Sequence, residues 1–384
     1  MTETNKPKPG RAQQWSTRAL FFVGGFGSAS WAPLVPYLKA RLDIGEDTLG
    51  LLLLCIGIGS LLTMPFSGAA ASRLGCRKVL TAAGAAYPVL LLVLCLVSNI
   101  YLAIPALLVF GAIMGCIDVV VNVQAVIVEK AAGRRLMSGM HAMWSLGGFA
   151  GSGLFSLWVG SLGLSAWQST WIAGFIMWLL VGIFSHLLLN YGGDPGGRLI
   201  ALPHGIVTFV GIIACIAFLV EGAMMDWGGV FLNQARGFDM SLAGMGFSVF
   251  SLAMLAMRLL GDGLVQRFGQ RLIILGGVVL AWIGFMLLIF APGSIGLFLG
   301  FFLIGIGSAN VVPVFYSLLG RQNVMLISLA VPAVSTLGYL GILMGPAAIG
   351  FLAHMTSLYT AFGFLASLVV LEGIIAAYVY HRIL

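Results

Sequence analysis

Charged residues are scarce in this sequence, and their scarcity is the first constraint on its fold. Only 8% of the 384 residues are Asp, Glu, Lys or Arg, whereas soluble domains carry about 25%. The hydrophobic share is 60%, and the mean hydropathy is +1.07. A soluble fold of this length could not bury so much apolar surface. The composition therefore predicts an integral membrane protein whose apolar surface is covered by a lipid bilayer.

Cysteine is also rare, and the patterns of several common chemistries are missing. The five cysteines form no CxxC pair, and four of them lie inside apolar runs, so we interpret them as packing residues. No Walker-type phosphate loop, zinc-ligand spacing or Ser/His/Asp arrangement stands out. We therefore expect no enzyme activity, no metal and no cofactor. Without an ATP-binding domain, any energy input would come from an ion gradient, such as a proton gradient, or from a solute's own gradient.

Twelve apolar runs are long enough to cross a bilayer as helices, which takes about 20 residues each. They cover residues 18–39, 47–71, 78–97, 100–128, 139–161, 167–189, 205–233, 241–265, 272–291, 295–319, 326–353 and 357–380. The predicted fold is all-α and polytopic, with a cytoplasmic tail (1–17), a six-helix bundle (18–190), a cytoplasmic central loop (191–203) and a second six-helix bundle (204–384). The polar tail has no cleavage site, so we expect the first helix to remain as an uncleaved anchor.

The positive charge follows the predicted topology. The net charge is +7, and fifteen of the 19 Lys and Arg residues fall on the side of the N-terminus, three fall on the other side, and Arg258 lies within a span. This bias predicts that both termini are cytoplasmic in a bacterial inner membrane. Because the basic residues lie in short loops, we interpret them as topology signals and expect no nucleic-acid partner.

The two halves of the sequence resemble each other at a shift of about 194 residues. The shift superposes Arg73-Leu74-Gly75 on Arg267-Phe268-Gly269, and Gly147 and Gly151 on Gly341 and Gly345, while a shift of 192 places Asp118 on Asn310. Paired six-helix halves are typical of secondary transporters, which bind solute between them near mid-membrane. The alternative is a chance match between glycine-rich segments.

Two motifs resemble a known family. The segment Gly68-Ala-Ala-Ala-Ser72-Arg73-Leu-Gly75-Cys76-Arg77-Lys78 is similar to the loop motif G-x-x-x-D-R-x-G-R-R/K of the major facilitator superfamily, with Ser72 at the aspartate position. The segment from Asp118 to Gly148, together with Glu221–Trp227, resembles the fucose-permease-like, YbjJ-type branch. This resemblance implies the major facilitator fold and a proton-linked carrier of sugars, although Ala32 stands where fucose carriers have an acidic residue.

Three ionisable residues inside predicted spans are candidates for proton coupling: Asp118, Glu221 and His141. An ionisable group at the centre of a membrane helix costs about 2.5–3.5 kcal/mol, so such groups usually face the bundle interior. Asp118 and Asn122 are four residues apart and share one helix face, and we expect Asn122 to bind solute hydroxyls. The alternative for these residues is a structural hydrogen bond between spans.

Further candidates fall into two sets. Those expected to bind solute combine aromatic faces and polar groups at membrane depth: Asp226, Trp227, Trp31, Trp144, Asn310, Tyr316 and Tyr339. Those expected to form a cytoplasmic gate lie at predicted inner ends, where opposite charges can hold the halves closed: Arg73, Arg77, Glu129, Arg258, Asp262 and Arg267. Arg258 and Asp262 could pair along one helix, whereas Arg77 and Arg267 could equally meet lipid headgroups.

The first functional hypothesis is proton-coupled symport of a small polar, sugar-like solute by a monomer in a lipid bilayer. The second is proton-driven efflux of amphipathic compounds, for which the 17 methionines and 25 phenylalanines would form an adaptable apolar site. A membrane receptor or scaffold is a third hypothesis, but it would need a large soluble segment.

Overall fold

The computed structural model describes residues 9–44, 46–193, 202–238 and 245–383, and within those ranges it is helical with no strand. Ten of the described helices are long and apolar enough to cross a membrane. The remaining two predicted spans, the first and the fifth, are helices that carry more polar and small residues. Most of the predicted central loop lies outside the described residues.

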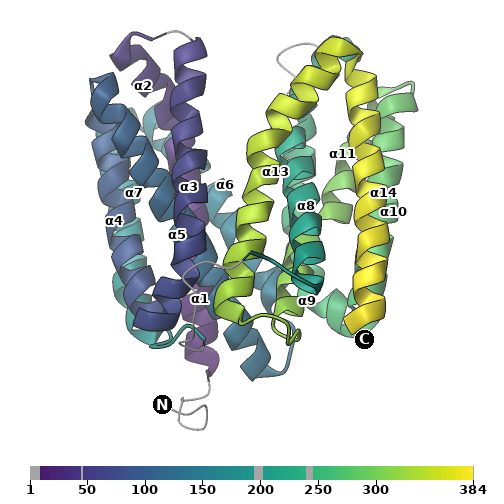
Figure 1. Cartoon of the computed structure of the whole chain (residues 1–384). Helices are drawn as coiled ribbons and strands as arrows, with labels where there is room; N and C mark the ends of the chain where they lie inside the picture. Colours follow the sequence, from purple (N-terminus) through teal and green to yellow (C-terminus); the bar gives the residue numbers. More distant parts are fainter. Residues whose placement is uncertain (1–8, 45, 194–201, 239–244, 384) are drawn as a thin grey trace. The chain divides into compact units, whose positions relative to one another are not determined.

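The chain forms two compact units (Figure 1). The first consists of Met1–Leu136, Met140–Ala201 and Leu326–Pro332. Its helices are α1 (Arg11–Trp31), which continues through a 3-10 turn (Ala32–Leu34) into α2 (Val35–Leu42), then α3 (Glu46–Leu74), α4 (Cys76–Leu96), α5 (Ile100–Ala132), α6 (Met137–Gly160) and α7 (Ala166–Phe184), which ends in a 3-10 turn (Ser185–Leu187).

The second unit consists of Met137–Gly139, Leu202–Met325 and Ala333–Leu384. Its helices are α8 (Ile206–Val230), extended by a π turn (Phe231–Ala235), then α9 (Met245–Phe268), α10 (Gln270–Phe290), α11 (Ser294–Ser308), α12 (Val311–Leu319), α13 (Ile327–Met355) and α14 (Leu358–Ile383). The first turn of α6 therefore belongs to the second unit, and the first turn of α13 belongs to the first unit.

The twelve predicted spans all coincide with helices, with two differences of detail. Helix α1 begins at Arg11, inside the predicted polar tail. The predicted tenth span is two helices, α11 and α12, separated by a turn at Ala309 and Asn310. Pro313 accounts for the break, because it has no N–H to donate to the carbonyl of Ala309, four residues earlier.

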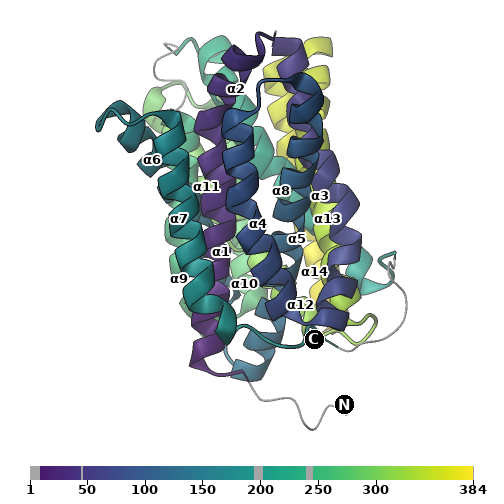
Figure 2. The same cartoon turned by 90° about the vertical axis from the view of Figure 1, so that its left-hand side faces the viewer.

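Each unit has its own core. In the first, α3 packs along α5, and α4 packs between α5 and α7, an arrangement visible in Figure 2. In the second, α10 packs against α11 and α14, with a cluster of buried phenylalanines at the centre. The rings of Phe231 and Phe362 in that cluster are stacked at 4.1 Å. Many large apolar side chains remain exposed on both units, as expected for surfaces that face lipid.

The internal repeat extends to backbone geometry. Gly75 and Gly269, which the shift superposes, precede α4 and α10 with φ of 85° and 81°, a left-handed conformation that favours glycine. Gly147 of α6 lies so close to α1 that a side chain there would overlap the carbonyl of Phe22, and Gly341 of α13 is in the same relation to Cys215 of α8. Small residues thus allow the same close helix approach in each half.

A pair of arginines repeats the same contact. Arg41, at the end of α2, donates hydrogen bonds to two backbone carbonyls at the end of α4, and Arg236, after α8, donates to two at the end of α10. The last carbonyls of a helix have no partner within it, and a cation there also interacts favourably with the helix dipole. The two halves therefore share side-chain contacts as well as helix order.

Candidate functional site

Three buried polar residues of the first unit form a hydrogen-bonded cluster between α5 and α6, which we call the α5–α6 cluster: Asp118, Asn122 and His141. The amide nitrogen of Asn122 donates to the backbone carbonyl of Asp118 at 2.9 Å and lies 3.3 Å from its Oδ1. His141 Nε2 lies 3.1 Å from Asn122 Oδ1. Since an amide oxygen only accepts, Nε2 of His141 is the donor.

The carboxylate of Asp118 lies at one end of this cluster. Asp118 is 9% exposed, and its Oδ2 has no hydrogen-bond partner in the described part of the chain. Its neighbours Val119 and Val120 are fully buried. A buried carboxyl oxygen without a partner is unfavourable when charged and is relieved by a proton or a bound donor. The geometry thus leaves Asp118 able to accept either one.

Aromatic rings pack beside the cluster. The ring of Phe21 lies 5.0 Å from that of His141 and 6.5 Å from that of Trp144. Trp144 is half-buried and its ring rests on Gly24 of α1. Trp31, a predicted solute-binding residue, is 6% exposed and packs on Phe110 in the core of the unit. Of the two tryptophans, Trp144 is therefore the one beside the ionisable residues.

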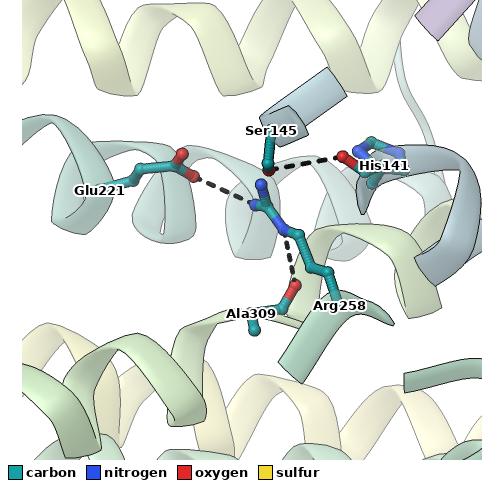
Figure 3. Close-up of polar contacts among 5 residues, drawn as sticks. All are labelled: His141, Ser145, Glu221, Arg258 and Ala309. Atoms are coloured by element: carbon teal, nitrogen blue, oxygen red, sulfur yellow. Dashed lines mark hydrogen bonds and ion pairs between the residues drawn. The ribbon is translucent and has the colours of Figure 1, made fainter. Parts of the chain in front are cut away.

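A charged cluster occupies the second unit (Figure 3). Arg258 of α9 places Nη2 3.4 Å from Glu221 Oε2 of α8, and its Nε donates to the carbonyl of Ala309 at 3.1 Å. The arginine side chain is 7% exposed, whereas that of Glu221 is 35% exposed. The carbonyl of Ala309 is available because Pro313 cannot bond to it, so the break in the tenth span creates the arginine's acceptor.

The sequence placed Arg258 in a cytoplasmic gate, where it could pair with Asp262. The structure pairs Arg258 with Glu221 of another helix, and the Asp262 carboxylate accepts the N–H groups of Ser138 and Gly139 at 2.9 and 2.8 Å. Asp262 therefore caps the first turn of α6, where four helix N–H groups lack partners within the helix. Spacing along one helix could not reveal these contacts, because the partners come from other helices.

The α5–α6 cluster has a counterpart in the second unit. Tyr316 and Ser335 lie 194 residues after Asn122 and His141, and their hydroxyl oxygens are 2.6 Å apart. Ser335 was not a candidate from the sequence, although applying the repeat shift to His141 would have found it. Tyr316 is buried as part of this contact. The two halves thus form the same bond between equivalent helices with different side chains.

Asn310 lies at the break between α11 and α12 and is 2% exposed. Its Nδ2 lies 3.4 Å from the carbonyl of Met257, and its Oδ1 has no hydrogen-bond partner within the described residues. It lies against Gly261 of α9, where a side chain would meet its oxygen. Asn310 therefore lies where the break between α11 and α12 meets α9, the helix that carries Arg258.

The remaining solute-binding candidates of the second unit lie apart along α8 and α13. Helix α8 runs without a break through Gly222 and Gly228 to Val230. Asp226 is consequently exposed, since it points away from Glu221 by the helix rotation. Trp227 packs against Gly350 of α13, and the ring of Tyr339 meets that of Phe218 edge-on at 6.3 Å.

The other gate candidates lie at helix ends. Arg73 and Arg267 are exposed, and Arg77 is half-buried. Glu129 is 6% exposed and accepts the N–H of Leu136 at 2.7 Å, with Arg135 at 3.8 Å. Glu129 therefore holds the loop between α5 and α6, and Arg135 is a partner that sequence reasoning missed.

Known proteins share both the sequence pattern and this architecture. The sequence profile of the Major Facilitator Superfamily matches residues 19–320. The chain belongs to the major facilitator superfamily. It is 47% identical to an uncharacterized MFS-type transporter of Yersinia pestis, over 94% of each chain. It is 29% identical to the membrane protein MosC of Rhizobium meliloti, over 93% of this chain and 86% of that one.

Solved structures confirm the fold. The human organic anion transporter MFSD10 superposes with a TM-score of 0.78 at 15% identity, covering 95% of this chain and 99% of that one. A structure of the E. coli fucose:proton symporter FucP superposes with a TM-score of 0.77 at 15% identity, covering 95% of this chain and 98% of that one. The chain is therefore a multi-pass membrane transporter and not an enzyme.

Proposed function

We propose that this transporter carries a small polar, sugar-like solute together with protons, by alternating access across the bacterial inner membrane with both termini in the cytoplasm. The observation that carries the proposal is the α5–α6 cluster, in which a buried carboxyl oxygen without a partner adjoins a hydrogen-bonded Asn122–His141 pair. Ionisable residues at membrane depth are typical of proton pathways in transporters.

The cluster provides a route to coupling. A protonated Asp118 presents an O–H that a solute hydroxyl can accept, whereas an ionised Asp118 presents only acceptors. A bound proton therefore gives Asp118 a donor for the solute hydroxyl, and a bound solute hydroxyl stabilises the protonated form. Each raises the affinity for the other. Histidine titrates near physiological pH, so His141 is suited to take up and release a proton beside Asn122.

The second unit contributes an ion pair that protonation can also break. Protonation of Glu221 removes the negative partner of Arg258, and the freed guanidinium can then bind a solute oxygen. The 3.4 Å separation of the pair is longer than the separation of about 2.7–2.9 Å that is typical of strong charge-assisted bonds. The partly exposed position of Glu221 is consistent with access to water.

The test begins with a thermal-shift screen of the purified protein against monosaccharides, sugar acids and amphipathic drugs, because a bound ligand raises the apparent stability. Uptake of the stabilising compound is then measured in proteoliposomes with an inward proton gradient. Asp118→Asn should abolish gradient-driven uptake while leaving exchange of solute across the membrane.

Asp43→Asn is the matched control. Asp43 is an exposed carboxylate in a left-handed conformation, which asparagine adopts readily, so this variant should transport like the wild type. Gradient-driven uptake that survives Asp118→Asn would refute the role of Asp118. If only the amphipathic drugs stabilise the protein, and they move in the direction opposite to the proton gradient, the result would instead support the exporter.

A further inference from the structure

A buried carboxyl group on the last helix has no part in either cluster. Glu372 is the only acidic residue of α14, and it is 4% exposed. Its Oε1 has no hydrogen-bond partner in the described part of the chain. It lies near the middle of a helix of 26 residues, well away from either end.

The packing around Glu372 is apolar. Val369 and Ala376, one helical turn on either side, are buried, and the adjacent Gly373 lies against Val278 of α10. Helix α14 packs on α10, on α8 and on the π turn that follows α8. The residue is therefore enclosed within the second unit instead of facing solvent at a helix end.

The charged groups on those elements are paired elsewhere or exposed. On α8, Glu221 pairs with Arg258 and Asp226 is exposed, and Cys215 is the other titratable side chain. On α10 the only charged group is Arg271, which is exposed in the first turn. The π turn has none, and Arg236 just beyond it binds carbonyls at the end of α10. On α14 itself the others are His381 and Arg382 in the last turn, with Tyr359, Tyr378 and Tyr380.

We propose that Glu372 is a proton-binding site in the second unit, loaded in this structure and unloaded at another step of the transport cycle. A carboxylate oxygen without a partner is unfavourable in apolar packing, so the arrangement seen here suits the neutral acid. Loss of the proton requires α14 to shift against α8 and α10, so that water or a cation reaches the oxygen. Purely structural packing would be served better by an apolar side chain.

This inference deepens the proposed proton coupling and rests on it, but its test needs no solute. The probe is dicyclohexylcarbodiimide, an apolar reagent that adds to protonated carboxyl groups. Purified protein in liposomes is labelled over a series of buffers from mildly acidic to alkaline, and the modified peptides are quantified by mass spectrometry. We expect an adduct on Glu372 whose yield falls about tenfold per pH unit above the midpoint of its titration.

Two variants make the result decisive. Glu372→Gln should remove the adduct and shift the pH dependence of transport, while Glu372→Leu should accumulate in the membrane and unfold at or above the wild-type temperature. Equal labelling at every pH would identify a permanently neutral structural acid and would overturn the proposal. Asp118→Asn reports on the proposed function separately, because it leaves Glu372 unchanged.

Discussion

The two units form a hydrogen bond at the same position of the repeat, but between different side chains. Between α5 and α6 the bond joins Asn122 to His141, beside the ionisable Asp118, whereas between α12 and α13 it joins the hydroxyls of Tyr316 and Ser335. The position of a bond between helices follows from the repeated backbone, but its ability to carry protons depends on the side chains. The bond of the first unit therefore includes an ionisable side chain, whereas the bond of the second unit joins two uncharged hydroxyl groups.

Charge in the second unit instead comes from a different pair of helices. Arg258 of α9 binds Glu221 and the carbonyl of Ala309, and its counterpart in the first unit at the 194-residue shift is Met64, which is fully buried. The comparison teaches that a duplicated scaffold can place one half's ionisable groups on α5 and α6 and the other half's on α8 and α9.

The largest effect should come from breaking the shared backbone geometry. Gly147→Val places a branched side chain against the carbonyl of Phe22, and overpacking of this kind costs about 1–3 kcal/mol or more. We expect little folded protein, measured by size-exclusion chromatography in detergent. Gly153→Val on the same helix is the control, because nothing lies within 4 Å of a side chain built there. Equal loss in both variants would show that helix propensity, and not close approach, is responsible.

An intermediate effect should follow when the second unit is made like the first. Arg258→Met leaves the Ala309 carbonyl and Glu221 without their partner, at a cost of about 2 kcal/mol. Glu221→Gln leaves a buried guanidinium without its negative partner and should also lower the unfolding temperature. The double variant should be more stable than the sum of the two single effects allows, as measured by a thermal-unfolding cycle. Strict additivity would mean that the pair is not coupled.

The smallest effect on stability separates the two equivalent bonds. Tyr316→Phe removes one hydrogen bond and should cost about 1 kcal/mol without changing the pH dependence of transport. His141→Gln keeps a donor for Asn122 but cannot titrate, so it should shift the pH dependence with little loss of stability. If both variants shift the pH profile equally, the proposed difference between the halves is wrong.

The helices were predictable because each needs only a local signal. A run of about 20 apolar residues must form a helix in lipid, since every backbone group has to be bonded within its own segment. The break between α11 and α12 also has a local cause in Pro313, although hydropathy alone predicts one continuous span. The early start of α1 at Arg11 escaped prediction, because polar residues carry no hydropathy signal for helix.

The candidate site was predictable only in part. Asp118 and Asn122 share a helix, so their spacing already placed them on one face, and the structure adds a hydrogen bond between them. The contact of Arg258 with Glu221 was not predicted, because spacing along α9 favours Asp262 while this contact crosses to α8. Ser335 and Arg135 were missed, since each matters only through a residue on another segment.

The sequence by itself determined that this chain is a membrane protein, that it crosses the membrane as helices, and that it consists of two similar six-helix halves. Those properties follow from hydropathy, glycine spacing and charge counts, each read along the chain. Only the tertiary structure decided which polar groups meet, that Glu221 holds Arg258, and that Glu372 is enclosed without a partner for Oε1 among the described residues. The physical reason is that burial and hydrogen bonding in a bundle join residues from different helices, and distance along the chain does not record such contacts.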